Sequence, residues 1–348
     1  MAGDIPIHPG IVPVPGRGQD EGGCNLRTLI AAGCLALVVA WASPTGALAG
    51  PAVNQFEVKN LHNEPGEIEF QSQNAHTFGQ PRRKFLEPAP GDFEYDGNAL
   101  VRQRHALEIE MVLTRYFRTR VGIEYESERL DDPATFAEAN SFSALSLTEV
   151  ALEGVVILSP VKSEGIGFGA LVEYQLPVGD STEAATLFFG PIIQAKRGPW
   201  DLTANLMLVK HLRGGAIAVG RPGRDEKWDF AYATHVQYKF SDAWTFSLEA
   251  YGTIDRLGNS GTRSDEAILF GDHDQHRIGP VVYYTFKPEG LDRVAGRRTK
   301  ARTKATALDD DDTDGDEGTS VRLGLGLLFG LNQNTADHTL KWSLEVEF

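Results

Sequence analysis

Cysteine is scarce in this chain: only Cys24 and Cys34 occur among 348 residues, and both lie near the N-terminus. The remaining sequence can therefore form neither an internal disulfide nor a thiolate metal site. Long hydrophobic runs are missing too, because the longest, residues 29–42, falls short of the roughly 20 residues that a membrane-spanning helix needs. Basic residues are outnumbered, 33 Lys and Arg against 48 Asp and Glu, which argues against a nucleic-acid partner. These absences exclude a polytopic helical membrane protein and a nucleic-acid-binding protein.

The N-terminal part of the chain has the layout of an export signal. Arg27 precedes the apolar run, and a small-x-small cleavage pattern, Ala-Leu-Ala, ends at residue 49. A buried core helix is the alternative interpretation of this run. We expect residues 1–49 to be a signal peptide with an N-terminal extension, and residues 50–348 to form the mature, cysteine-free protein.

Along the rest of the chain, apolar and polar residues alternate with a period of two. The last segment shows this most clearly, because apolar side chains occupy the even-numbered positions from Leu340 to Phe348 and polar ones the odd-numbered positions between them. The pattern is typical of β-strands with one apolar and one wet face. We count twelve such segments, at residues 66–75, 100–113, 117–128, 146–158, 165–176, 185–197, 199–211, 228–240, 243–255, 274–286, 319–331 and 337–348.

The links between these segments alternate in length, as they do in transmembrane barrels with short periplasmic turns and long external loops. Tight turns at 114–117, 159–164, 197–199 and 241–243 alternate with long links near 76–99, 129–145, 212–227 and 256–273. Two links depart from this scheme: the one near 177–184 is short for an external loop, and 287–318 is long for a turn. A soluble sandwich would show the same alternation of residues. The export signal and the even number of segments favour an all-β, antiparallel transmembrane β-barrel of about twelve strands.

Aromatic residues beside the tight turns and the end of the chain support this interpretation. The residues that we expect at the membrane interface are Tyr116, Phe117, Trp200, Phe240 and Trp244. The terminal Phe348, with apolar residues at alternate positions before it, resembles the signal by which the assembly machinery recognises Gram-negative outer-membrane β-barrels. The hairpins TRYFRTRVGIEYE and FSDAWTFSLEAYG are similar to those of poorly characterised proteobacterial transporter-like barrels. The resemblance implies an outer-membrane location, periplasmic termini, and outer-membrane lipids and the assembly machinery as partners.

If the apolar face contacts lipid, the alternate residues point inward and carry charges of both signs. The channel-lining candidates are Arg102, Arg104, Glu108, Glu110, Arg118, Arg120, Glu124, Glu126 and Glu249. Further inward candidates are Glu149, Glu153, Glu173, Lys196, Asp201, His235, Lys239, Asp255, Arg277, Arg322, Lys341 and Glu345. Eight strands enclose only packed side chains and sixteen leave an open channel, so twelve lies between these cases. We expect a channel or transporter-like barrel for small polar or charged solutes; the alternative is a closed scaffold that presents external loops.

An enzyme is a third interpretation, because some outer-membrane barrels hydrolyse lipids. Those enzymes carry a His-x-Ser pair, which places base and nucleophile on one face of a strand. None of the nine histidines here is followed two positions later by serine, and no Gly-x-Ser-x-Gly motif occurs. We therefore expect no enzymatic activity and no catalytic residue.

A short acidic stretch before one predicted strand carries a weak indication of metal binding. Asp272, Asp274 and His276 alternate along the chain, so an extended strand would place them on one face. Carboxylate and imidazole side chains bind divalent transition metals. A solvated polar loop end is the simpler interpretation.

The charged, low-complexity insertion at 287–318 is basic in its first half and acidic in its second. Blocks of this kind stay unfolded, so we expect a disordered periplasmic polyampholyte. Asp310, Asp312 and Asp314 match the first half of a calcium loop, but Val321 stands where a bidentate Glu is needed. We therefore expect no cofactor, with Ca²⁺ at this insertion as the alternative.

Overall fold

The computed structural model describes residues 56–85, 93–130, 142–178, 185–212, 228–257, 274–288 and 319–348. The predicted signal peptide, most of the long predicted links and nearly all of the charged insertion lie outside these residues. The described chain contains twelve strands: β1 (Ile68–Phe85), β2 (Phe93–Thr114), β3 (Phe117–Leu130), β4 (Ser146–Ser159), β5 (Gly165–Pro177), β6 (Thr186–Arg197), β7 (Trp200–His211), β8 (Trp228–Lys239), β9 (Trp244–Ile254), β10 (Gln275–Phe286), β11 (Ser320–Gly330) and β12 (His338–Glu347). Among the described residues, no helix has the length and hydropathy to cross a membrane.

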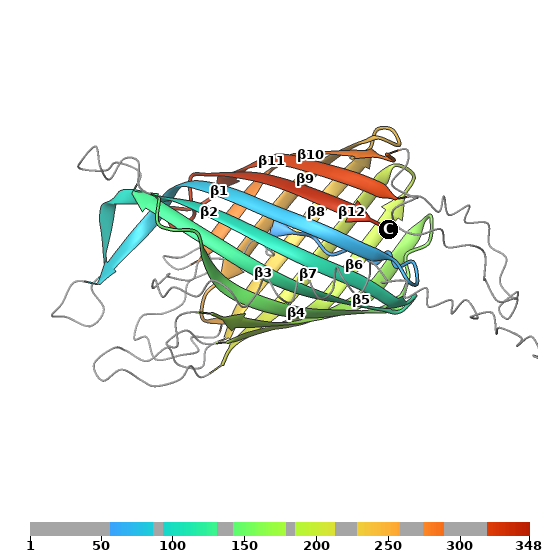
Figure 1. Ribbon diagram of the computed structural model, residues 1–348, viewed down its shortest axis with the longest axis horizontal. Coiled ribbons are helices and arrows are strands. Elements are labelled where there is room, and N and C mark those ends of the chain that lie inside the picture. The colour runs from blue at the N-terminus through green and yellow to red at the C-terminus, as the bar shows by residue number, and fades with distance from the viewer. Residues whose placement is uncertain are drawn as a thin grey trace, which may run out of the picture. The chain divides into compact units, whose positions relative to one another are not determined.

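The twelve strands form one closed antiparallel sheet, which Figure 1 shows as a barrel of tilted strands. Each strand pairs with its neighbours in sequence, and β1 pairs with β12 from Glu69↔Glu347 to Phe78↔His338, which closes the sheet. In lipid no water can satisfy an unpaired backbone N–H or C=O, so a sheet can cross a membrane only when it closes on itself. The predicted fold class is confirmed.

Ten of the predicted strands agree with the structure to within two residues at each end, and the first hairpin does not. The predicted long link at 76–99 is wrong, because β1 continues to Phe85 and β2 begins at Phe93. Register shifts follow Thr77 in the pairing of these strands, and Gly79 has a φ of 69°. Such irregularities interrupt the period of two while the backbone pairing continues, so the alternation gave no sign of the strand.

The two ends of the barrel differ. We call the end with the turns β2–β3, β4–β5, β6–β7 and β8–β9 and the C-terminal Phe348 the turn end, and the opposite end the loop end. The five aromatic residues expected at the membrane interface, Tyr116, Phe117, Trp200, Phe240 and Trp244, lie beside these turns and are 37–69% exposed. Aromatic neighbours extend this band, because the Trp200 and Tyr238 ring centroids are 4.8 Å apart.

Large apolar side chains cover the exterior of the barrel. On β5 the exposed residues alternate with buried ones, and the exposed set is Ile166, Phe168, Val172, Tyr174 and Leu176. An apolar exterior of this kind matches the lipid-facing band of transmembrane barrels.

The outward face of β1 is unusually polar. Asn74 is 3% exposed, and its Nδ2 donates to Ser72 Oγ at 3.0 Å while its Oδ1 lies 2.7 Å from His105 Nδ1. The His105 ring in turn packs edge-on against Trp342, with centroids 6.3 Å apart. Because these polar groups form hydrogen bonds with one another, the free-energy cost of placing them on the lipid-facing side is smaller.

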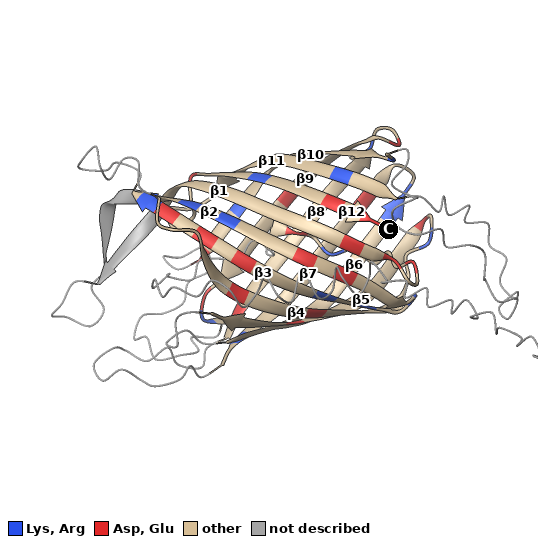
Figure 2. Cartoon of the chain, viewed as in Figure 1, with Lys and Arg blue, Asp and Glu red and all other residues tan. Residues whose placement is uncertain are grey.

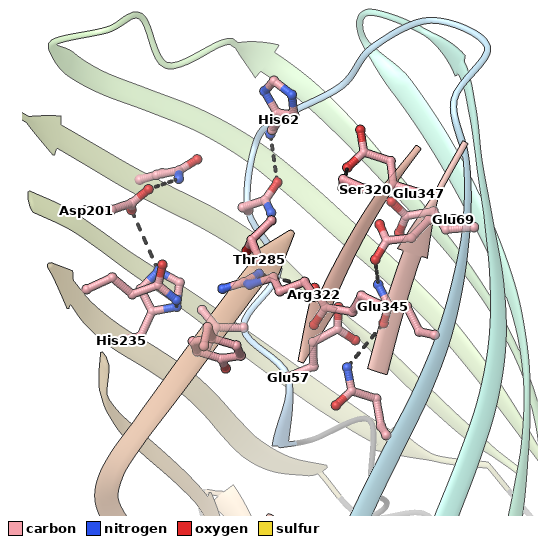
Figure 3. Close-up of a pocket in the computed structure, with 18 of the residues that line it drawn as sticks. Glu57, His62, Glu69, Asp201, His235, Thr285, Ser320, Arg322, Glu345 and Glu347 are labelled. Carbon is pink, nitrogen blue, oxygen red and sulfur yellow. Dashed lines mark hydrogen bonds and ion pairs between the residues drawn. The ribbon is translucent and has the colours of Figure 1, made fainter. Parts of the chain in front are cut away.

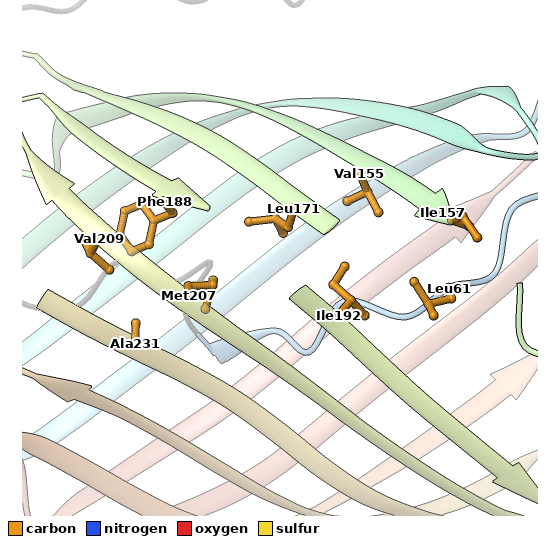
Figure 4. Close-up of a cluster of buried hydrophobic side chains, with 9 residues drawn as sticks. All are labelled: Leu61, Val155, Ile157, Leu171, Phe188, Ile192, Met207, Val209 and Ala231. Carbon is orange, nitrogen blue, oxygen red and sulfur yellow. The ribbon is translucent and has the colours of Figure 1, made fainter. Parts of the chain in front are cut away.

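The interior of the barrel has a charged part and an apolar part. Buried charged residues are most frequent on β2 and β3, and Figure 2 colours the positions of basic residues blue and of acidic residues red. The inward side of β4–β8 instead carries an apolar cluster, which Leu61 from the residues before β1 completes. Figure 4 shows its members: Leu61, Val155, Ile157, Leu171, Phe188, Ile192, Met207, Val209 and Ala231. The sequence interpretation did not include this cluster. The sequence feature that indicates this cluster is the pair of continuous apolar runs at 155–158 and 206–209, where both faces of a strand are apolar.

Gly190 allows β6 to approach β7 closely, because a Cβ atom there would lie 1.9 Å from the carbonyl oxygen of Leu206. We predict that Gly190→Ala lowers the free energy of unfolding by about 1–3 kcal/mol, since the two strands must separate. Gly154→Ala is the control, because its Cβ would meet only the Phe117 ring at an ordinary 3.4 Å. Urea unfolding of the refolded protein in detergent measures both variants, and equal midpoints would contradict the prediction.

Candidate functional site in the barrel interior

Residues 56–63, which precede β1, lie inside the barrel and are called here the lumenal segment. Phe56 is 2% exposed and packs edge-on against the inward-facing Tyr251 of β9, with ring centroids 5.5 Å apart. Leu61 belongs to the apolar cluster of Figure 4. The sequence interpretation missed this segment, because its short stretch has no periodic pattern that places it in a barrel interior.

Two buried side-chain amides bind the backbone of the lumenal segment. Asn205 on β7 accepts from Lys59 N at 2.6 Å, and its Nδ2 donates to Lys59 O at 2.9 Å. Gln194 on β6 accepts from Leu61 N at 2.9 Å. These amides supply hydrogen bonds that the backbone of an isolated extended segment would otherwise lack inside the barrel.

Arg118 on β3 binds the same segment nearer the turn end. Its Nη2 donates to Asn60 O and its Nη1 to His62 O, both at 2.8 Å. Its Nε lies 3.3 Å from a carboxylate oxygen of Glu110 on β2. One guanidinium therefore links two strands of the wall to the lumenal segment.

Arg120 is the centre of a second network on the charged wall. Its Nη1 donates to Glu108 at 2.6 Å and to Glu57 of the lumenal segment at 2.5 Å, and its Nη2 donates to Glu153 on β4 at 2.8 Å. Lys59 Nζ lies 3.4 Å from Glu153, which adds a second cation. Charges taken out of water are tolerated only when they are paired in this way.

The pairing of β2 with β3 follows from the order of charges along the two strands. Each strand carries two arginines followed by two glutamates, so antiparallel pairing places Arg104 opposite Glu126 and Glu110 opposite Arg120. Toward the loop end, Arg104 Nε donates to Glu126 at 2.7 Å, and Arg102 Nε lies 3.1 Å from the same carboxylate. Glu124 lies 3.7 Å from Arg104 Nε.

Glu249 on β9 is the hub of a third network across the barrel. It accepts from Lys341 Nζ at 2.7 Å, from Tyr283 OH at 2.6 Å and from Tyr251 OH. The Arg322 guanidinium lies over the Tyr283 ring at 3.9 Å. All nine channel-lining candidates are therefore interior residues, eight on β2 and β3 and one on β9, and none is more than 6% exposed.

A cavity of about 410 Å³ lies beside the lumenal segment at the turn end, and Figure 3 shows its walls. Nearly all of its lining is charged or polar. The carboxylates are Glu57, Glu67, Glu69, Glu110, Asp201, Glu345 and Glu347, and the cations are Arg118, Lys196, Arg322 and Lys341. Such a lining favours water and small polar solutes over apolar ones.

Of the residues considered for metal binding, the structure describes only Asp274 and His276. His276 Nε2 lies 3.8 Å from Asp274 Oδ2, and its Nδ1 lies 2.9 Å from Tyr232 OH. Within the described ranges, no group of three or more His, Cys, Asp or Glu side chains could hold a metal ion. Asp272, Asp310, Asp312 and Asp314 lie outside the described residues.

No protein-family model and no curated protein matches this sequence. Several solved structures are similar to this chain at low sequence identity. An outer membrane channel from Pseudomonas putida F1 has a TM-score of 0.47 at 10% identity, over 82% of this chain and 94% of that chain. The NanC porin has a TM-score of 0.41 at 7% identity, over 80% of this chain and 98% of that chain. The translocator domain of the autotransporter NalP from Neisseria meningitidis has a TM-score of 0.39 at 11% identity, over 82% of this chain and 89% of that chain.

The class of the protein follows from the barrel itself. The sheet is closed, its exterior is apolar, and its charged residues are gathered inside. The chain is a closed, twelve-stranded antiparallel β-barrel of the transmembrane type, as the alternation of its residues indicated.

We predict that Arg120→Met destabilises the barrel by about 3–5 kcal/mol, because it leaves Glu57, Glu108 and Glu153 without their shared cation. Lys239→Met is the control, since Lys239 is 59% exposed in its pair with Asp242 and such pairs contribute under about 1 kcal/mol. The temperature at which the folded band converts to the unfolded band in SDS gels measures both. A smaller effect for Arg120→Met than for the control would show that the network is dispensable.

Glu67 precedes β1 at the turn end, where burial and then the Glu347 carboxylate raise its pKa to about 7. The folded protein therefore holds this proton more tightly than the unfolded chain, and stability falls as the pH rises through 7. We predict that Glu67→Gln is more stable than the wild type at pH 8 and matches it at pH 4. The exposed Glu64→Gln is the control, and unfolding midpoints at both pH values test the prediction; a gain of Glu67→Gln at pH 4 alone would contradict it.

Proposed function

We propose that this protein is an outer-membrane channel for small polar or charged solutes. The observation that carries the proposal is the 410 Å³ cavity at the turn end of the barrel interior, with its charged lining. In a membrane-spanning barrel, a hydrated interior that excludes apolar solutes is the requirement for selective passage by size and charge. Of the nine interior candidates on β2, β3 and β9, Glu110 and Arg118 line this cavity, and in the proposed channel the other seven line the rest of the path.

The lumenal segment narrows this path. Asn205 and Gln194 bind its backbone to β7 and β6. Arg118 and Arg120 on β3 also bind it, Arg118 through Asn60 O and Arg120 through the Glu57 carboxylate. In the proposed channel, residues 56–63 therefore limit the size of the solute that passes the turn end.

A closed scaffold barrel is the second candidate function. The buried ion-pair networks and the lumenal segment favour it, because both fill space that a solute would need. A charged interior stabilises a closed and an open barrel equally well, so conductance is the property that separates the two candidates.

We further propose export by a cleaved signal at 1–49, recognition of Phe348 by the assembly machinery, and outer-membrane lipids around the exterior. We assign the channel no cofactor and no catalytic step. The solutes recognised by the charged interior are small, and passage needs no covalent chemistry.

Planar-bilayer recording tests the channel. We predict discrete current steps for the wild type and larger steps for Asn205→Leu, because the variant removes both hydrogen bonds to Lys59 and releases the lumenal segment. Ala204→Leu, on the lipid side of the same strand, is the control and should match the wild type. If folded wild-type protein and both variants pass no current, the scaffold is correct; equal steps in the wild type and Asn205→Leu would show that the segment does not limit the path.

A further inference from the structure

Arg277 on β10 is a buried cation with unusual surroundings. Its side chain is 3% exposed, its Nη2 donates to Gln275 at 3.2 Å, and its Cζ lies 4.8 Å over the ring of Phe56. Its Nε has no hydrogen-bond acceptor, and no carboxylate of the described residues lies within ion-pair distance of it. By contrast, other interior arginines each pair with at least one glutamate: Arg102, Arg104, Arg118 and Arg120.

Arg104 on β2 is a second interior arginine with a donor that has no acceptor. Arg104 uses its Nε for Glu126, and its Nη1 is buried without an acceptor. Charged donors that are buried and unsatisfied are rare and costly, so this part of the interior lacks an acceptor group.

We propose that Arg277 forms a binding site for an oxyanion, the carboxylate or phosphate group of a small solute. The proposal rests on the proposed channel function and names its solute class. A guanidinium presents N–H donors in a planar fork that matches two oxygens. An oxyanion beside Arg277 gives the unsatisfied Nε of this guanidinium a charge-assisted hydrogen bond.

The surroundings leave one edge of the Arg277 guanidinium available. Phe56 covers one face of Arg277, so the in-plane donors at Nε are left for a ligand. A cavity of about 10 Å³ borders Arg277, the room of about one water molecule, so the long arginine side chains must rotate to admit a larger oxyanion.

Phosphate-dependent stability tests the site without requiring conductance. The unfolding temperature of the purified barrel in detergent is measured against inorganic phosphate, acetate or chloride at constant ionic strength. We expect a saturable rise with phosphate, with acetate or with both, and none with chloride. Which of the two oxyanions acts identifies the group that the site takes. Arg277→Gln should fold, since it removes an unpaired buried charge, and should weaken oxyanion binding by about tenfold, which corresponds to about 1.4 kcal/mol.

Lys239→Gln is the control, because Lys239 lies outside the cavity and already has a carboxylate partner, Asp242, at 2.9 Å. It should keep the oxyanion response of the wild type, and Arg277→Lys should keep part of it. No saturable oxyanion response in the wild type, or the same response in Arg277→Gln, would overturn the proposal. Absence of bilayer current combined with an Arg277-dependent response would reject the channel while leaving the oxyanion site in place.

Discussion

The constraint on which the whole structure depends is the pairing of backbone groups in a medium without water. A sheet that crosses a bilayer cannot leave an edge, because each free N–H and C=O in hydrocarbon costs several kcal/mol. The pairing of β1 with β12 meets this constraint. Closure then assigns alternate residues to lipid and to the interior, and it is this division that collects the charges of an acidic chain inside a barrel.

Closure also places many charged side chains in the interior, where each needs a partner of opposite charge. Arginines and glutamates on β2 and β3 are arranged so that opposite charges meet across the strands, and Arg120 binds three carboxylates from different parts of the chain. The lumenal segment belongs to this solution, because its Glu57 and Lys59 join the same network. Arg277 is the interior arginine for which no such partner is seen in the described part of the chain. The interior therefore consists of a wall of ion-paired side chains, the lumenal segment bound to that wall, and one cation, Arg277, without a carboxylate partner among the described residues.

Most of the fold could be predicted because the period of two is a local property of the sequence. Ten strands with clean alternation, such as that ending at Phe348, were placed to within two residues. The first hairpin was missed where register shifts beyond Thr77 break the period. The polar outward face of β1 is explained only by Asn74 and His105, which meet in space and are 31 residues apart in sequence.

The interior was less predictable, because its contacts are long-range. The sequence indicated which residues of β2 and β3 point inward, but not that Arg120 would meet Glu57 of a segment inside the barrel. The bonds of Asn205 to Lys59 span 146 residues and leave no periodic trace. Only the apolar runs at 155–158 and 206–209 carried a readable sign of the apolar inner wall, since a strand that is apolar on both faces cannot have water on either.

The most direct test of the account is a disulfide across the closing seam. Gln73 on β1 is the register partner of Ser343 on β12, and both point inward. The alternation of bonds from the Ile68–Phe348 pair makes this a non-hydrogen-bonded pair, whose Cα separation of about 4.5 Å suits a disulfide. With Cys24 and Cys34 replaced by serine, cysteines at 73 and 343 should crosslink on oxidation in the folded protein, and cysteines at 73 and 345 should not. Crosslinking of the offset pair, or of neither pair in heat-modifiable protein, would contradict the closed barrel and its register.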